Sequence, residues 1–556
     1  MRVSLILLSL LILSSCSKSE QAPSGAGKEL IVSSIYGGDR VEEGEWKSVV
    51  SISKLNYKDE VTTSFCTGTL IDKKTVLSAA HCFKRVKDYY LRSAAISLDN
   101  IDAKERSFIR IKNVRIHPDY TGENSASDFA LIDLESEANV SDDEILPIYT
   151  STDYEKGQGV ELVGFGKTEA GTNGIKFEVS TQIREDLQTE FSAGGNGKDT
   201  CAGDSGGPLF IKNEEGIFAL AGVTSRTPDD ANSYCGDKTI YGKAAHAMKW
   251  IESERLIDKA LALNSKESID VLKLAAKSFR KYYKVYQHLG EYYLKFSMHD
   301  LAQSALLKAI ILRKDDKRSL DLLRELYSVT GDIDKEITIL KRLLFLSPGE
   351  ESYFLRLDFF GQTSEAEIAR GLGRFRSGDI HMARADLELH RDNSRAAFVL
   401  SFCEFKSRNY EEAKIILNSI KEDIPFVDIR DSRGDSFLMA AVFEGEEEIV
   451  RELLRFKPNL EVKDSYGNNL AQIAWWAKEF SLVKLMVSLG VEWNANDYFQ
   501  QFIYFIQGER ISEVRFFLDM GVDINLVGPK GERAINLARE TGNLELIKLI
   551  ENYGKE

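Results

Sequence analysis

The chain lacks several features that would mark common classes of protein. It has no block rich in Lys and Arg, no platform of interleaved aromatic and basic residues, and a formal net charge of −15. Proteins that bind nucleic acid gather basic residues on one face, so these absences argue against such a partner. Beyond a short apolar run at the N-terminus, no second hydrophobic span follows. Cysteine is also scarce, with six residues in the whole chain.

The length indicates several domains, because 556 residues exceed what a single hydrophobic core supports. The composition changes along the chain from β-rich to helical. We therefore predict a signal peptide over 1–15, a flexible tether over 16–34, a β-rich domain over 35–254, and two sets of helical repeats over 265–421 and 424–556.

The first residues have the pattern of an export signal. Arg2 precedes an apolar run, Val3 to Leu13, that is too short to span a bilayer and suits a secretory signal. Leu13-Ser-Ser-Cys16 resembles a bacterial lipobox, which implies cleavage before Cys16 and its acylation. Ser17 then favours outer-membrane sorting in a cell with two membranes. The alternative is an ordinary signal with an incidental cysteine. We expect a lipid-anchored protein of the cell envelope, released if the tether is cut.

Three segments supply the parts of an activated nucleophile. They are Leu77-Ser-Ala-Ala-His81-Cys82, Asp128-Phe-Ala-Leu-Ile132 and Cys201-Ala-Gly-Asp-Ser-Gly-Gly-Pro-Leu209. A serine hydroxyl is a poor nucleophile until an imidazole takes its proton and a buried carboxylate fixes the tautomer of that imidazole. The three segments provide one candidate for each role.

In their order and their local sequence, these segments resemble the catalytic segments of the trypsin and chymotrypsin family of serine endopeptidases. The resemblance implies that Ser205 is the nucleophile, His81 the general base and then acid, and Asp128 the orienting carboxylate. The N–H groups of Gly203 and Ser205 would form the oxyanion hole. No cofactor and no metal site are predicted.

The resemblance also implies a fold of two packed six-stranded antiparallel barrels over residues 35–254. Short β-branched and aromatic runs between turn residues agree with it. The runs are Ser48 to Leu55, Phe108 to Ile116 and Val160 to Phe165. A closing helix is expected over Ala244 to Ile251, with Trp250 on its buried side.

The cysteines fit the same family. The resemblance pairs Cys66 with Cys82 and Cys201 with Cys235, which implies an oxidising compartment. The alternative is four unpaired buried cysteines. Cys403 has no obvious partner and is expected to be a small core residue.

The predicted substrate-binding residues are Asp199, Ser225, Thr227 and Thr239, and they do not agree on specificity. Asp199 stands where trypsins carry the pocket-floor carboxylate, which favours cleavage after Lys or Arg. Thr227 and Thr239 stand where trypsins have glycine, and bulkier walls favour small residues. We predict basic specificity, with cleavage after small residues such as Ala, Val or Thr as the alternative.

Ile35-Tyr-Gly-Gly38 resembles the new N-terminus that appears when zymogens of the family are cut. Its ammonium group would pair with Asp204 and order the Gly203 amide. Ser34 is not basic, so we expect another protease to make the cut. The alternative is that Ile35 simply begins the first strand and no processing occurs.

Beyond Arg255 the periodicity becomes helical. One set of apolar positions recurs after about 34 residues, as in tetratricopeptide repeats. Generic helical hairpins are the alternative. The recurring positions are Leu289, Tyr293, Ala302 and Ala309, then Leu323, Tyr327, Leu340 and Pro348, with weaker units over 370–387 and 397–417.

The last segment has a period of about 33, between Gly434 and Gly467 and between Gly521 and Gly554, and resembles ankyrin repeats. Its third unit, Asp497 to Asn525, lacks the usual loop glycine. Protein binding is the expected role, with a purely structural extension as the alternative.

Taken together, the sequence predicts a secreted, lipid-anchored serine endopeptidase with a trypsin-like domain and a repeat tail that recruits partners or substrates. Its substrates would be proteins or peptides, and the membrane would be contacted through the lipid on Cys16. The competing hypothesis is an inert protease-like module in a binding scaffold.

Overall fold

The computed structural model describes residues 35–553 apart from 57, 59, 84–93, 104–106, 123, 168–172, 422–426 and 529–530. The predicted signal peptide, the acylation of Cys16, the tether and the role of Gly554 therefore lie outside the described residues. The chain divides into two compact units. The first contains residues up to 258 together with 277–280, and the second contains 259–276 and 281–556.

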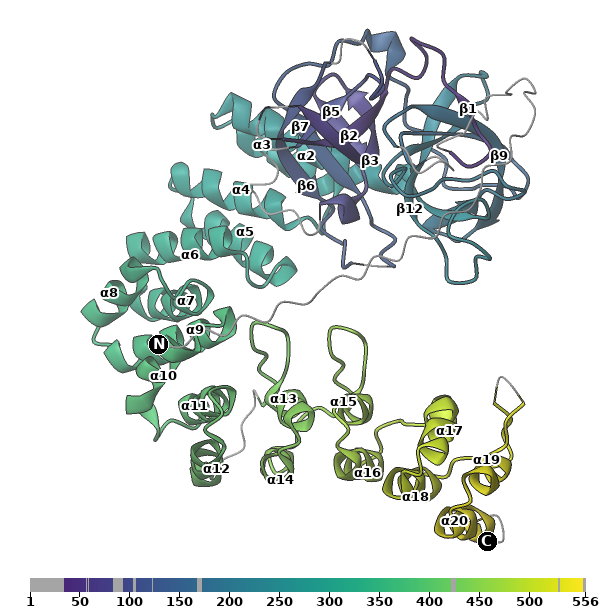
Figure 1. The fold of residues 1–556 in the computed structure, drawn as a ribbon. Coiled ribbons are helices and arrows are strands. Elements are labelled where there is room, and N and C mark those ends of the chain that lie inside the picture. The colour runs from purple at the N-terminus through teal and green to yellow at the C-terminus, as the bar shows by residue number, and fades with distance from the viewer. Residues whose placement is uncertain are drawn as a thin grey trace, which may run out of the picture. The chain divides into compact units, whose positions relative to one another are not determined.

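A closed antiparallel barrel forms the first half of the first unit (Figure 1). Its neighbouring strands run in the order β2-β3-β4-β7-β6-β5. Val50, Ile52, Leu70 and Ile132 are fully buried inside it, so the β-branched runs read from the sequence supply its core. The strands are β2 (Val49–Leu55), β3 (Val61–Asp72), β4 (Thr75–Ser78), β5 (Ala94–Ser97), β6 (Ile109–Ile116) and β7 (Ala130–Leu134).

A second six-stranded barrel follows, in the order β9-β10-β13-β12-β11-β8, and closes through the pairing of β8 with β9. A short strand, β1 (Asp39–Arg40), adds to β9 at its edge. The predicted fold of two six-stranded antiparallel barrels is confirmed. The strands are β8 (Gly159–Gly164), β9 (Phe177–Asp186), β10 (Glu190–Ala193), β11 (Pro208–Lys212), β12 (Phe218–Arg226) and β13 (Thr239–Lys243).

The closing helix is longer than predicted. Helix α2 (Ala244–Leu263) begins where expected and buries Trp250 completely, but it continues beyond Ile251. The extra turns have a partner in the first barrel, because the buried guanidinium of Arg115 on β6 contacts Glu254 at 3.1 Å and Asp258 at 3.0 Å. These ion pairs hold the extra helical turns against the barrel.

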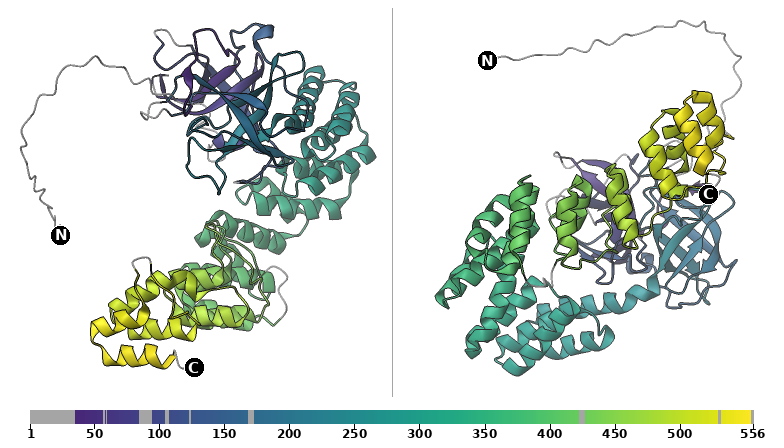
Figure 2. Two further views of the ribbon diagram at one scale, coloured as in Figure 1. Left: turned by 90° about the vertical axis from the view of Figure 1, so that its right-hand side faces the viewer. Right: turned by 90° about the horizontal axis from the view of Figure 1, so that it is seen from below.

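The second unit is helical. Figures 1 and 2 show its helices arranged largely as successive antiparallel pairs, as a helical repeat array requires. The predicted recurring positions Leu289, Tyr293, Ala302 and Ala309 are buried between α4 and α5. The first set of helices is α3 (Ser268–Ser278), α4 (Tyr283–Lys295), α5 (His299–Leu312), α6 (Lys317–Thr330), α7 (Ile333–Leu346), α8 (Glu351–Phe359), α9 (Thr363–Ser377), α10 (Ile380–Leu387), α11 (Ser394–Lys406) and α12 (Tyr410–Ser419).

Helices with connecting hairpin loops complete the unit. Gly434 and Gly467 occupy loops with φ of +90° and +87°, a conformation that glycine adopts without strain. Their assignment to ankyrin repeats, like that of the preceding helices to tetratricopeptide repeats, stays a prediction. The helices are α13 (Phe437–Glu444), α14 (Glu447–Leu454), α15 (Leu470–Trp476), α16 (Phe480–Ser488), α17 (Phe499–Gln507), α18 (Ile511–Asp519), α19 (Ala534–Thr541) and α20 (Leu544–Tyr553).

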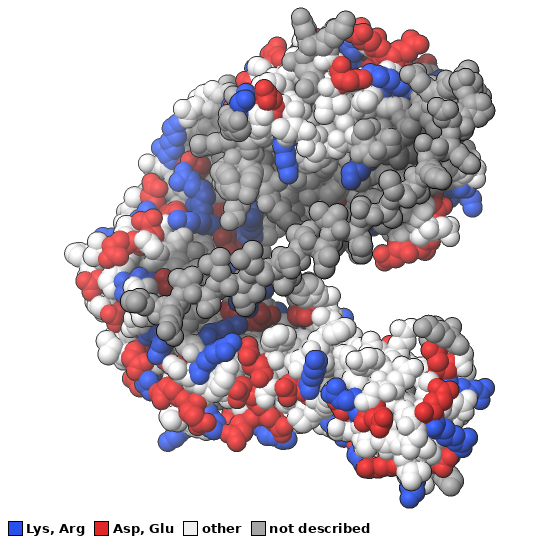
Figure 3. Space-filling view, in the orientation of Figure 1, with Lys and Arg blue, Asp and Glu red and all other residues white. Residues whose placement is uncertain are grey.

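Within the described residues, no helix combines the length and the apolar character needed to cross a membrane. Figure 3 shows acidic and basic side chains interspersed over the visible face of the helices, with no broad basic patch there. Cys403 lies fully buried in the helical core, as predicted, and burial raises the pKa of its thiol to about 12.

Candidate active site

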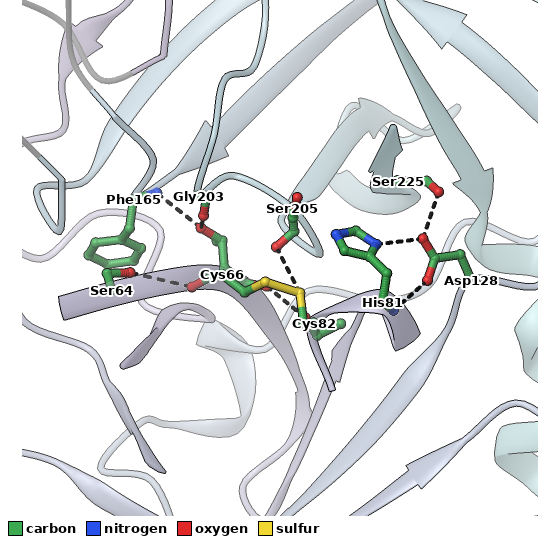
Figure 4. Close-up of a disulfide and its surroundings, with 11 residues drawn as sticks. Ser64, Cys66, His81, Cys82, Asp128, Phe165, Gly203, Ser205 and Ser225 are labelled. Atoms are coloured by element: carbon green, nitrogen blue, oxygen red, sulfur yellow. Dashed lines mark hydrogen bonds and ion pairs between the residues drawn. A yellow bond between two sulfur atoms is a disulfide. The ribbon is translucent and has the colours of Figure 1, made fainter. Parts of the chain in front are cut away.

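His81 lies on a short 3-10 turn, η1 (Ala80–Cys82), that follows β4. Its Nδ1 is 2.7 Å from Oδ2 of Asp128, and its backbone N–H donates to Oδ1 of the same carboxylate at 2.9 Å. Two contacts from one residue fix both the position and the tilt of the imidazole. Figure 4 shows the ring of His81 between Asp128 on one side and Ser205 on the other.

Asp128 is almost fully buried, with 6% of its side chain exposed. Ser225 donates a third hydrogen bond to it, from Oγ to Oδ2 at 2.7 Å. Burial alone would raise the pKa of Asp128, but the hydrogen bonds from His81 and Ser225 outweigh burial and hold that pKa below its ordinary value. The carboxylate is therefore kept charged where it faces the imidazole.

Ser205 sits in a tight loop that only glycine neighbours permit. Gly203 has a φ of +102°, and a Cβ there would lie 2.9 Å from the Cα of Gly166. Thr67 of β3 secures this loop, because its Oγ1 donates to the carbonyl of Gly203 at 3.0 Å and its N–H to that of Ser205 at 2.9 Å. Among the residues that the structure describes, the N–H groups of Gly203 and Ser205 have no acceptor. Two backbone donors beside the hydroxyl are thus free.

Both predicted disulfides are confirmed. Cys66 is bonded to Cys82, directly after His81, and Cys201 to Cys235. The first bond ties the η1 turn to β3, and the Sγ of Cys82 lies 3.7 Å from the carbonyl oxygen of Ser205 (Figure 4). His81 lies close to both sulfurs of the first bond. A disulfide offers no thiolate, so these three residues do not form a metal site.

Asp204 is fully buried and lacks a cation among the described residues. Its carboxylate accepts backbone N–H bonds from Gly166 at 2.7 Å and Cys201 at 2.9 Å. Burial, helped by the neighbouring charge of Asp199, raises the pKa of Asp204 to about 7. The side chain of Ile35 is also fully buried, in the core of the second barrel.

Asp199 is a second buried carboxylate, with no exposed surface. Burial raises its pKa to about 7, and the nearby N–H groups of Thr200 and Gly236 and the hydroxyl of Thr239 only partly offset that rise. Neither oxygen makes an ion pair or a hydrogen bond of good geometry among the described residues. Thr239 lies close by, since its Oγ1 accepts from the hydroxyl of Thr200 at 3.0 Å. Thr227 instead points to the following loop, where its hydroxyl donates to the carbonyl of Tyr234 at 3.3 Å. The two predicted wall residues are therefore held in different ways.

One ion pair near the site was not predicted. Arg226, the residue after Ser225, makes a double contact with Glu190 of β10, at 2.5 and 2.9 Å. Nearby carboxylates, first Glu190 and then Asp128, raise the pKa of this arginine despite burial. The only sequence signal for Arg226 was its position beside Ser225, and nothing in the sequence pointed to Glu190.

Comparison with known proteins agrees with this geometry. Residues 35–251 match the family model described as Trypsin. The chain is 28% identical over 254 residues to CLIP domain-containing serine protease B4 of Anopheles gambiae, with 39% of this chain and 69% of that protein covered. It is 29% identical over 244 residues to coagulation factor XI of Bos taurus, with 39% of this chain and 37% of that protein covered. The family match thus covers the barrels and ends at residue 251.

Proposed function

Because residues 35–251 form a trypsin-like serine protease domain, we propose that the chain is a serine endopeptidase that hydrolyses peptide bonds. The observation that carries the proposal is His81, which Asp128 holds at two points on one side while Ser205 lies on the other. An inert module would have no need for this arrangement.

The chemistry follows from the positions of the groups. Ser205 Oγ attacks the carbonyl carbon of the scissile bond, and His81 takes the hydroxyl proton. The carbonyl oxygen becomes an oxyanion, which the free N–H groups of Gly203 and Ser205 stabilise. His81 then gives the proton to the leaving amine, and water repeats the sequence on the acyl-enzyme. Asp128 keeps the imidazole in the required tautomer and stabilises its charged form.

We also propose that Asp199 selects substrates with Lys or Arg before the scissile bond. A buried carboxylate without a cationic partner is costly, and none is found for Asp199 among the described residues, so a substrate cation would supply the missing charge. The two proposed threonine walls favour the alternative, in which the substrate has a small side chain before the scissile bond. One of them, Thr239, accepts a hydrogen bond from the hydroxyl of Thr200, the residue after Asp199.

The remaining parts of the proposal concern processing and location. Cleavage before Ile35 would create an ammonium group for Asp204, which has only backbone donors in the described chain. The same cut would separate the domain from a lipid on Cys16. The helical unit would recruit protein partners or substrates.

A fluorophosphonate probe tests the proposal directly, because it reacts only with an activated serine. We expect covalent labelling of the purified, processed chain at Ser205 and none in the Ser205→Ala variant. Absence of labelling in a protein that starts at Ile35 would favour the inert module.

Ser225→Ala should lower kcat by roughly tenfold, because Asp128 loses one charge-assisted hydrogen bond while those from His81 remain. The KM should change less than kcat if the role of Ser225 is to position Asp128. Steady-state kinetics on a peptide amide measure the two parameters, with Thr224→Ser on the same strand as the control. A change confined to KM would place Ser225 in substrate binding alone.

The unprocessed domain should lose stability as the pH rises from about 4 to about 7. Burial raises the pKa of Asp204 to about 7 from an ordinary value of 3.8, so the folded state binds a proton that the unfolded state has already released. Above pH 7 the folded chain must hold a buried charge.

Denaturant unfolding between pH 4 and pH 8 checks this slope. Asp204→Asn should remove part of the pH dependence of the free energy of unfolding. The remaining part comes from Asp199, whose pKa burial raises in the same direction. In the processed form, the new ammonium group of Ile35 should lower the pKa of Asp204, so the free energy of unfolding should change less with pH. Identical slopes for the wild type and Asp204→Asn would contradict the assignment.

A further inference from the structure

The segment that leads into α17 lacks the hairpin loop found in the segments that lead into α15 and α19. Residues 455–469 lead into α15 and residues 520–533 into α19, and each contains an antiparallel bridge, Lys463 with Asn469 and Val527 with Arg533. Residues 489–498, which lead into α17, are fewer and contain the 3-10 turn η4 (Ala495–Tyr498) instead. Figure 1 shows loops beside α13 and α15 and none beside α17.

The missing loop coincides with a hollow. Its volume is about 520 Å³, and the start of α15 and the short connection line it together. This volume lies within the range of roughly 300–1,000 Å³ found for ligand sites. Among the residues that line it are Asn469, Gln472, Glu492, Trp493, Asp497 and Tyr498.

One wall of the hollow is aromatic and held firmly in place. The rings of Trp493 and Tyr498 stack with their centroids 5.2 Å apart and their planes 10° from parallel. Trp475 on α15 lies 5.0 Å from Tyr498, and Phe516 on α18 lies 5.6 Å from Trp493. Packing from both neighbouring helical pairs thus fixes an apolar surface that is only partly exposed.

The rim of the hollow is acidic. Glu492 and Asp497 are exposed, and none of the lining residues is Lys or Arg. Asp497 accepts one hydrogen bond from Asn494 at 3.1 Å, and no ion pair involves either carboxylate among the residues that the structure describes. The nearby amides are engaged, since Gln472 accepts from the N–H of Asn469 at 2.9 Å. The charge available to a ligand is therefore negative.

We propose that this hollow binds the side chain of a Lys or Arg in a protein segment. Such side chains combine a long apolar stem with a charged head. The stem would lie along Trp493 and Tyr498, and the head would pair with Glu492 and Asp497. An acidic segment would be repelled, and a neutral one would leave the carboxylates unused. This binding site is separate from peptide hydrolysis and does not depend on it.

The test uses the full chain with Ser205→Ala, so that no peptide is cut. The probe is a fluorescein-labelled Gly-Ser peptide with a central Leu-Arg-Leu, and matched peptides carry Gln or Glu in place of Arg. Fluorescence polarisation should show at least tenfold tighter binding of the Arg peptide than of the Gln peptide, and no binding of the Glu peptide. The affinity should fall severalfold between 50 and 300 mM NaCl.

Matched variants locate the binding. Glu492→Gln with Asp497→Asn should weaken the Arg peptide about tenfold, whereas Glu540→Gln with Glu545→Gln, two exposed carboxylates on the last helical pair, should leave it unchanged. Circular dichroism confirms that both variants are folded. Equal affinity for the three peptides, or unchanged binding in the first variant, overturns the proposal. Displacement of the Arg peptide by a neutral sugar such as maltotriose also overturns it, because the site would then not depend on charge.

Discussion

Replacing Ser205 with alanine should lower peptidase activity by about 10⁴-fold or more while leaving the domain folded. The hydroxyl is the proposed nucleophile, and without it only the free N–H groups of Gly203 and residue 205 remain to stabilise a transition state. Within the described part of the chain the hydroxyl makes no hydrogen bond, so its loss should not change the free energy of unfolding. Hydrolysis of a fluorogenic peptide and denaturant unfolding measure the two quantities.

His81→Ala should have an effect of similar size, and the double variant should be no worse than either single one. The reason is that the serine is not activated without the imidazole, so the second substitution has nothing left to remove. Independent roles would instead multiply the two losses. Activity in Ser205→Ala within tenfold of the wild type would rule out this serine as the nucleophile.

Asp199→Ser should lower kcat/KM for substrates with Arg or Lys before the scissile bond by roughly 10² to 10³-fold. That range corresponds to about 3–4 kcal/mol, which is within the cost expected for a buried charge that loses its partner. The same variant should be more stable than the wild type at neutral pH, because Asp199 makes no ion pair among the described residues and burial raises its pKa to about 7. A drop in activity together with a gain in stability is the expected signature.

Cleavage sites in a digested peptide library, identified by mass spectrometry, provide the measurement. Asp229→Ser, which removes an exposed carboxylate from the nearby loop, is the control and should keep the wild-type preference. Products that end in Ala, Val or Thr would show that the walls of the pocket decide specificity. A preference for aromatic residues would contradict both versions.

The barrels and the placement of His81 beside Asp128 could be predicted because short segments carry them. The turn around Ser205 needs glycine at fixed positions, and the φ of +102° at Gly203 shows why local sequence is decisive there. The disulfides were also predicted, since each joins segments that the resemblance already placed. A feature that is formed by the residues of one short segment can be recognised from that segment alone.

Features made by distant partners could not be predicted. Glu190 and Arg226 meet across different strands, and neither residue signals the other in the sequence. The continuation of α2 past Ile251 depends on Arg115, which lies far earlier in the chain. The hollow beside Trp493 results from residues that are missing from a loop, and the weak third repeat gave no indication that a cavity would follow.

The network around Arg115 also decides where an expressed fragment of the protease should end. A fragment cut at 254 would remove Asp258 from this buried guanidinium, which is 9% exposed. It would also remove Phe279, whose ring lies 5.8 Å from that of the buried His117. A fragment that stops after Arg280 keeps both contacts, but it also carries residues 259–276, whose packing belongs to the second unit. The sequence boundary of the family match is therefore not the structural boundary of the protease domain.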